Sequence, residues 1–129
     1  MIEPRCILSG DNFNPSHLID KLTDVTIEKI IGTGEISNRG RYKLQPSPYG
    51  LCQIWTPSNV PMPDRIKWMT TLISQHSESF RSSGVTDIEL NILWTGRQGN
   101  MEFTHEELVG IAELGIPLTI NYSFEEKGN

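Results

Sequence analysis

One short stretch, residues 7–15, constrains the fold of this chain more than any other part of the sequence. It reads ILSGDNFNP, so an apolar segment stops at a Ser-Gly-Asp turn and an Asn-Pro pair follows at once. Asparagine is favoured as a helix N-cap, and proline is favoured at the first helical position, where its missing N–H group costs nothing. The stretch therefore predicts a strand at Arg5–Ser9 that turns directly into a helix at Pro15–Leu22.

Hydrophobic periodicity predicts the two longest elements. Thr86–Trp94 alternates apolar with mostly polar residues, which is typical of a strand that has one buried face. Pro63 opens the longest helix, and Gly84 ends it at the position where glycine is favoured. Apolar residues recur along this helix every three or four positions. The stripe consists of Ile66, Met69, Ile73, His76 and Phe80.

Shorter segments complete the pattern. Residues with β-branched or aromatic side chains predict strands at Val25–Ile31 and Leu51–Thr56, and alternation predicts a last strand at Leu118–Tyr122. Residues 96–100 form an expected turn, after which Met101–Phe103 could pair back as a short strand. The order of elements, with strands and helices mixed, predicts an α+β fold.

A capping box marks the last helix. The Thr104 hydroxyl can accept a hydrogen bond from the backbone of Glu107, whose carboxylate can reach back to Thr104. The helix is expected to end at Gly115, with Leu108, Ile111 and Ala112 on its inner face. The whole pattern predicts a two-layer α+β sandwich, in which a mostly antiparallel sheet carries about three helices packed on one face.

The length of the chain suits one domain. We expect residues 1–129 to form a single α+β domain with a polar tail at 124–129. No basic region followed by an apolar run suggests a secretory signal, and no apolar stretch approaches the roughly 18 residues of a membrane span. The sequence therefore predicts a cytoplasmic protein without a membrane partner. In that compartment Cys6 and Cys52 are expected to be reduced thiols in strands.

The charge is distributed unevenly. The net charge is −5, but residues 84–129 hold two Lys or Arg and eight Asp or Glu, which gives that third −6. Such a surface argues against nucleic-acid binding and favours a basic partner, or no charged partner at all. A solvated acidic surface that keeps the protein in solution is the plainer interpretation of the same charges.

No motif for catalysis, a metal or a cofactor emerges. The three histidines are scattered, and His105 lacks the second histidine that a zinc-binding helix would place on the same face. His76 lies on the apolar stripe of the long helix, which is typical of a core residue. No nucleophile has a base at a recognisable spacing. The sequence therefore predicts no catalytic residues, no cofactor and no metal.

The chain resembles a bacterial family of small α+β domains of unknown function, whose members resemble immunity proteins of toxin systems. The similarity rests on a Gly-Asp-x-x-x-Pro turn after the first strand, a Gly-Glu pair after the next, a Trp-bearing strand, and a Leu-Gly helix end before an alternating strand. These correspond to Gly10–Pro15, Gly34-Glu35, Ile54-Trp55, Leu114-Gly115 and Leu118–Tyr122. The chain departs from the family pattern at residues 22–26.

The resemblance implies a non-catalytic, cytoplasmic binding protein, most simply an immunity protein that inhibits a cognate bacterial toxin. Its partner would be a protein, such as a basic toxin domain. The outward residues of the clearest strand, Asp87, Glu89 and Asn91, are the candidate contact surface. Two other hypotheses stay open: a small-ligand binder or enzyme, with a pocket lined by Trp55, Trp68, Trp94 and His76, and a general protein-interaction module. The oligomeric state is not predicted.

Overall fold

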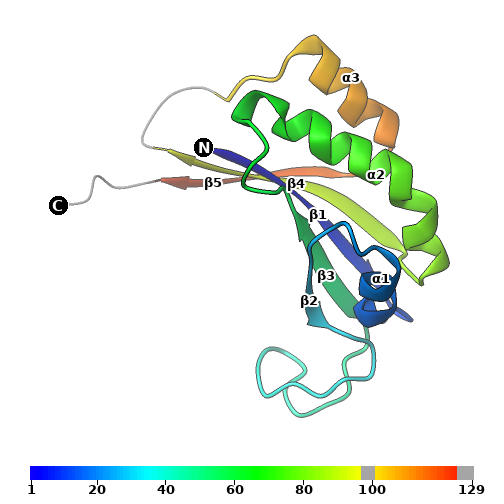
Figure 1. Ribbon diagram of the computed structural model, residues 1–129. Helices are drawn as coiled ribbons and strands as arrows, with labels where there is room; N and C mark the ends of the chain where they lie inside the picture. Colours follow the sequence, from blue (N-terminus) through cyan, green and yellow to red (C-terminus); the bar gives the residue numbers. More distant parts are fainter. Residues whose placement is uncertain (97–100, 125–129) are drawn as a thin grey trace.

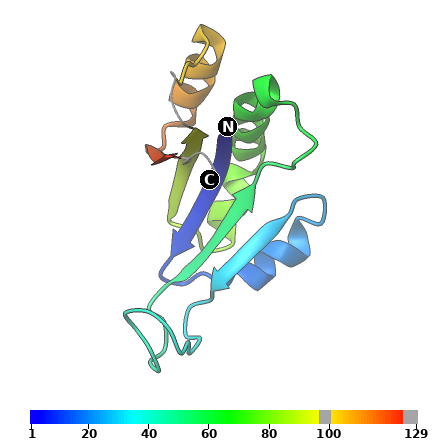
Figure 2. The ribbon, with the colours of Figure 1, turned by 90° about the vertical axis from the view of Figure 1, so that its left-hand side faces the viewer.

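Five strands form one sheet in the order β2-β3-β1-β4-β5 (Figures 1 and 2). The structure is a computed structural model and describes residues 1–96 and 101–124. The strands are β1 (Ile2–Gly10), β2 (Ile27–Ile31), β3 (Gly50–Trp55), β4 (Asp87–Gly96) and β5 (Leu118–Phe124). The helices are α1 (Pro15–Lys21), the short 3-10 helix η1 (Met62–Asp64), α2 (Arg65–Ser82) and α3 (His105–Leu114).

All neighbouring strands are antiparallel except β4 and β5. The chain leaves β4, passes through α3 and returns to the same sheet as β5, which is the crossover that a parallel pair requires. The first strand, β1, lies at the centre and pairs with both β3 and β4. The predicted α+β class with a mostly antiparallel sheet is confirmed.

The junction between β1 and α1 has the local chemistry that the sequence predicts. The Asn14 side chain accepts a hydrogen bond from the backbone N–H of Ser16, and Pro15 occupies the first turn of the helix. The Thr33 hydroxyl, from the loop after β2, accepts from the Phe13 N–H and donates to the Phe13 carbonyl oxygen. Hydrogen bonds of the Asn14 and Thr33 side chains therefore stabilise the turn. The Phe13 side chain is fully buried.

Three glycines allow other segments to approach this turn closely. A Cβ atom on Gly50, at the start of β3, would overlap the carbonyl oxygen of Phe13. One on Gly84, after α2, would overlap the carbonyl oxygen of Asn12, and one on Gly10 would overlap that of Gly84. The turn thus sits where the end of β1, the start of β3 and the end of α2 meet. Only residues without a side chain fit at these three contacts.

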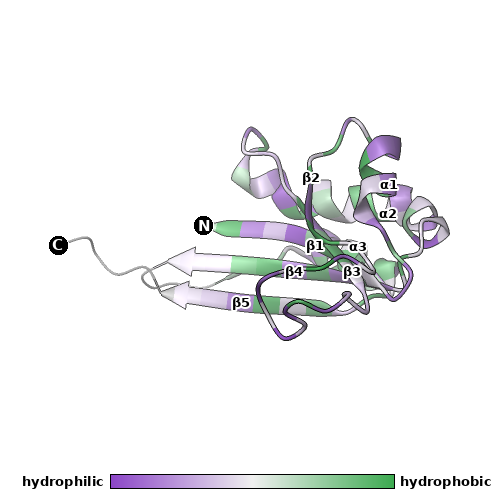
Figure 3. Ribbon diagram, turned by 90° about the horizontal axis from the view of Figure 1, so that it is seen from below, coloured by the Kyte–Doolittle hydropathy of each residue, from purple (hydrophilic) through white to green (hydrophobic). Residues whose placement is uncertain are grey.

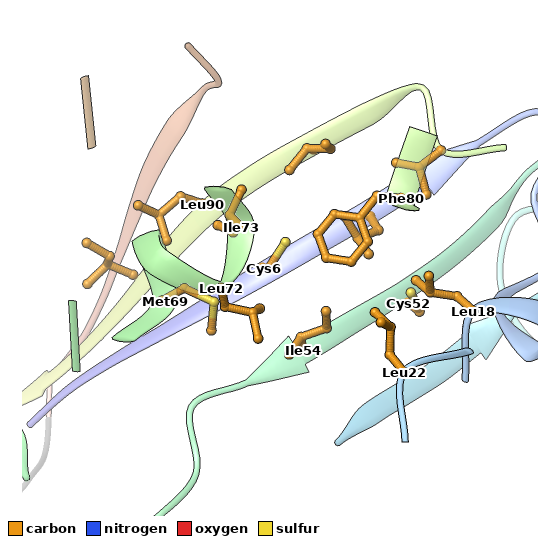
Figure 4. Close-up of a cluster of buried hydrophobic side chains, with 14 of the residues drawn as sticks. Cys6, Leu18, Leu22, Cys52, Ile54, Met69, Leu72, Ile73, Phe80 and Leu90 are labelled. Carbon is orange, nitrogen blue, oxygen red and sulfur yellow. The ribbon is translucent and has the colours of Figure 1, made fainter. Parts of the chain in front are cut away.

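The hydrophobic core lies between the sheet and the two helices α1 and α2 (Figure 4). Alternate residues of β1 and β3, among them Cys6 and Ile54, point into it, as do Leu90 of β4 and Ile73 of α2. The stripe predicted on α2 is buried at Ile66, Met69, Ile73 and Phe80. His76 is the exception, because it is only half-buried and lies at the margin of the core.

The last helix, α3, packs against α2 and not against the sheet (Figure 1). Only Ile111 of its expected inner face is buried, whereas Ala112 is exposed and Leu108 is about half exposed. The prediction for Leu108 and Ala112 was therefore wrong. The helix turns Gly110 toward Thr70 of α2 instead. As a result, the helix-side face of β5 is left without a cover among the described residues.

Most element boundaries agree with the sequence to within a few residues. The capping box of Thr104 and Glu107 is present, and Gly115 ends α3 in the left-handed conformation. The short strand expected at Met101–Phe103 is absent: these residues are irregular, and Met101 and Phe103 pack at the edge of the core. The turn expected at 96–100 and the tail expected at 124–129 were each placed one residue too early, because Gly96 belongs to β4 and Phe124 to β5. Residues 97–100 and 125–129 lie outside the described residues.

Candidate functional site

The sheet has a second face, opposite α1, α2 and α3, that no described helix covers (Figure 3). We call it the open face. Strand register and alternating burial assign its residues, because side chains directly opposite one another share a face. It includes Glu28, Glu3, Arg5, Ile7, Ser9, Leu51, Gln53, Trp55, Asp87, Glu89, Asn91, Leu93, Thr119 and Asn121.

A hydrogen-bonded network occupies the middle of the open face, with Asn91 of β4 at its centre. Arg5 Nε donates to Asn91 Oδ1 at 2.7 Å. The Asn91 amide then donates to Thr119 Oγ1 and to Asn121 Oδ1, each at 2.7 Å. Three strands are thereby joined through side chains as well as through the backbone. Asn91 is only 2% exposed, because its neighbours lie over it.

The network continues on both sides of this centre. Arg5 also donates to Gln53 Oε1 at 3.0 Å, and its guanidinium lies 5.1 Å from the centre of the Trp55 ring. Trp55 in turn donates to Glu28 of β2 at 3.0 Å. At the other end, the Thr119 hydroxyl donates to Glu89 at 2.9 Å. Side chains from all five strands are therefore held in fixed positions, as expected for a preorganised surface.

The open face is acidic. Its strands present four carboxylates, from Glu3, Glu28, Asp87 and Glu89, and one guanidinium, from Arg5. Arg5 is engaged with Asn91, Gln53 and Trp55, so its charge lies within the layer of side chains. The carboxylates lie around it, and Glu28 and Asp87 are exposed. This arrangement presents negative charge outward on a face that a partner could reach.

The three predicted contact residues differ in what they can do. Asp87 is exposed and Glu89 is half-buried, so both carboxylates can reach a partner. Asn91 is buried and all of its polar atoms are engaged within the sheet. It is placed to hold the surface in shape. Arg5 and Gln53 were missed, and Trp55 was predicted to line a pocket. The alternation of Glu3, Arg5 and Ser9 with buried residues of β1 is a signal that could have found Arg5.

The residues expected to line a ligand pocket do not converge. Trp55 lies on the open face, whereas Trp94 lies on the opposite face and packs at a tilt against Tyr122, with ring centres 4.6 Å apart. Trp68 and His76 of α2 do share an open groove of about 650 Å³ with the loop after α1 and the proline-rich connector. More of its exposed surface is apolar than polar, and among the described residues no hydrogen bond orients His76 as a base. Among the described residues, no group of His, Cys, Asp and Glu could hold a metal ion.

The two cysteines are free thiols on neighbouring strands, facing the core. Burial raises the pKa of Cys52 to about 12. Burial, with a smaller contribution from Cys52, raises the pKa of Cys6 well above its usual range. A thiol acts as a nucleophile only when it is ionised, so neither side chain is equipped for nucleophilic chemistry. Both cysteines lie in strands, β1 and β3, as predicted.

These raised pKa values predict how stability depends on pH. Folding makes both thiols hold their protons more tightly than the unfolded chain does. Their contribution to the free energy of unfolding is therefore complete at pH values below the unfolded-state thiol pKa of about 8.5. It is lost as the pH rises from there toward 12. Urea unfolding between pH 8 and 10.5 should show the loss. Over the same pH range, the Cys52→Ala variant should lose less unfolding free energy than the original chain. The two slopes should differ by up to about 1.4 kcal/mol per pH unit. Equal slopes for both proteins would contradict this prediction.

Comparisons of the chain with protein-family models, with curated proteins and with solved structures found no match. Among the described residues, no helix has both the length and the apolar character needed to cross a membrane. The geometry and the charge of the open face make it the candidate site.

Proposed function

We propose that this chain is a non-catalytic binding protein whose open face docks a basic protein, and that the partner is a bacterial toxin domain that the contact neutralises. One observation carries the proposal: a sheet face without a helical cover, framed by carboxylates and held by a network across all five strands. The resemblance to immunity-type domains supplies the class of partner, and the cytoplasm as the place of action belongs to the same proposal.

The rigidity of the open face favours tight binding. A surface whose side chains already have fixed rotamers loses little conformational entropy when a partner docks. Arg5, Asn91 and Gln53 are fixed by mutual hydrogen bonds, and Trp55 is fixed by Arg5 and Glu28. Trp55 also offers the kind of aromatic side chain that is enriched among the residues dominating binding energy at interfaces. We therefore place Trp55 at the centre of the contact.

The carboxylates favour selectivity for a basic partner. Complementary charge raises association rates, and like charges brought together disfavour other partners. Glu28 and Asp87 lie on different strands at opposite sides of the Arg5 network, so negative charge surrounds Trp55 and the central polar residues. Binding through this face should weaken as salt screens the charges.

Co-expression tests the proposal directly. The chain should rescue growth of cells that express a basic toxin domain encoded beside its gene, and the purified proteins should bind at submicromolar concentration. Failure to bind at micromolar concentration would overturn the toxin-inhibitor proposal. Capture of a non-toxic protein through the same face would instead favour the general interaction module.

Charge reversal on the open face should slow association with that partner. The Asp87→Lys/Glu89→Lys double variant places positive charge where the partner is basic, and we expect the association rate to fall by about tenfold or more. Stopped-flow or surface plasmon resonance at low salt would measure it.

The matched control is Glu78→Lys, because Glu78 is an exposed carboxylate on α2, on the opposite side of the molecule. This variant changes the net charge in the same direction but leaves the open face intact, so its association rate should stay within about twofold of the original. An equal loss in Glu78→Lys would show that net charge, and not the open face, governs binding.

A further inference from the structure

The two edges of the sheet are protected very differently. The β2 edge is short, carries Glu28 and Lys29, and has a register shift between Lys29 and Ile31. Charges, short length and irregularity are the devices that keep an edge strand from pairing with another chain. The opposite edge, β5, has seven residues in unbroken register with β4 and contains neither a charged residue nor a proline. Nothing in β5 itself blocks a further strand.

The backbone of β5 offers a regular set of unpaired groups. Leu90 donates its N–H to the Pro117 carbonyl oxygen, which sets the phase of the parallel ladder. Alternate residues of a strand direct their N–H and C=O groups to opposite sides. Thr119 and Asn121 therefore face β4, whereas Leu118, Ile120 and Tyr122 direct theirs to the free edge. No described strand pairs with that edge.

The same three residues expose apolar side chains. Leu118, Ile120 and Tyr122 are 37%, 45% and 48% exposed, although they lie on the helix side of the sheet. The cause is the position of α3, which packs on α2, so that no helix in the described part of the chain covers this side of β5. Leu108 of α3 adds a fourth exposed apolar side chain. Within residues 1–96 and 101–124, no strand pairs with this edge, and the apolar side chains beside it stay exposed even though Tyr122 packs against Trp94.

We propose that a second copy of this chain occupies the site, with β5 pairing antiparallel to the β5 of its partner about a twofold axis. In a register centred on Ile120, Leu118 lies opposite the partner's Tyr122, Ile120 lies opposite the partner's Ile120, and Thr119 lies opposite the partner's Asn121. Apolar residues then meet on the helix side and polar residues meet on the open face. The two five-stranded sheets become one continuous sheet.

The sequence of β5 fits a copy of itself better than it fits a charged partner. Because β5 is uncharged, the twofold axis brings no like charges together: Ile120 meets its own copy, and every other pair is apolar with apolar or polar with polar. The main interaction that opposes dimerisation is electrostatic repulsion, because each copy has a net charge of −5. Salt screens that repulsion, so dimerisation should strengthen with ionic strength. Binding of a basic protein at the open face should show the opposite salt dependence, which separates the two proposals.

Sedimentation analysis of the full chain at roughly 10–100 μM, the concentration range in which weak dimers form, tests the proposal. We expect about twice the monomer mass of 14.6 kDa in 0.5 M salt, a concentration chosen to give a Debye length of about 4 Å. Ile120→Lys places two like charges opposite each other and should weaken the dimer at least about tenfold. The matched control is Ile30→Lys, because Ile30 is 51% exposed on the β2 edge. It should leave the dimer intact.

Cross-linking provides a second measurement that does not depend on disruption. Ile120→Cys should form an intermolecular disulfide readily, because Cα atoms in opposed antiparallel positions are about 5.5 Å apart. The native thiols are buried and should not interfere. Ile30→Cys should cross-link at least about tenfold more slowly. A monomer in high salt, equal effects of the two lysine variants, or equal cross-linking rates would each overturn the proposal.

Discussion

Replacing Gly50 with alanine is expected to destabilise the fold by about 3 kcal/mol or more. The added Cβ atom would overlap the carbonyl oxygen of Phe13, which is backbone and cannot rotate away. Relief would require β3 to separate from the turn between β1 and α1, and the fully buried Phe13 side chain would move with that turn. Urea unfolding followed by tryptophan fluorescence would measure the loss.

The matched substitution is Gly110→Ala in α3. The nearest atom to a Cβ there is Thr70 Oγ1 at 3.5 Å, which is an ordinary contact. Alanine favours a helix over glycine by up to about 1 kcal/mol, so this variant should be more stable than the original chain. The same chemical change would thus have opposite signs at the two positions. A mild effect of Gly50→Ala, below about 1 kcal/mol, would show that the junction is not tightly packed.

Replacing Asn91 with leucine is expected to cost about 3 kcal/mol, even though the two side chains have similar size. The substitution removes three hydrogen bonds and leaves the Arg5 guanidinium without its closest acceptor. A hydrogen bond to a charged group contributes more than one between neutral groups, and a partner left unsatisfied adds its desolvation cost. Thermal and urea unfolding would both report the loss.

A double-mutant cycle isolates the pair from its surroundings. Removing both partners of a buried hydrogen bond costs less than removing one, so Arg5→Leu/Asn91→Leu should be less destabilised than the sum of the single variants. We expect a coupling of at least about 1 kcal/mol. Strict additivity would contradict the view that Arg5 and Asn91 act as a unit. The same double variant should also weaken binding at the open face, because it removes the support beside Trp55.

Local signals in the sequence predicted the five strands and the helices α1, α2 and α3, but they also predicted a strand at Met101–Phe103 that does not form. Asn14 and Pro15 marked the start of α1, Thr104 and Glu107 marked the start of α3, and the alternation in β4 marked its buried face. Each of these signals depends on residues within a few positions of one another. The inner face of α3 was only partly predicted, because Leu108 and Ile111 lie on the same apolar side of the helix. Only the position of α2 decides which of the two is buried.

The open face could be predicted only in part, because it depends on strand register. Asp87 and Glu89 were recognisable as outward residues from the alternation of β4 alone. The role of Asn91 was not recognisable, since its partner Arg5 is 86 positions away and the sequence does not state which strands are neighbours. Trp55 was predicted to line a pocket because the sequence does not show that β3 lies beside β1. Its place opposite Arg5 follows from the pairing of β1 with β3.

The central position of β1 has a consequence for how the chain is made. A ribosome releases β1 first, yet Gln53 and Asn91, the residues that Arg5 binds on either side, follow 48 and 86 positions later. The central strand β1 therefore has both edges unpaired until β3 has been synthesised, and one edge unpaired until β4 has been synthesised. Non-local pairing of this kind slows folding and exposes unpaired strands to association. Nascent chains should therefore need chaperones until β4 has left the ribosome, whereas the folded, full-length protein should not need them.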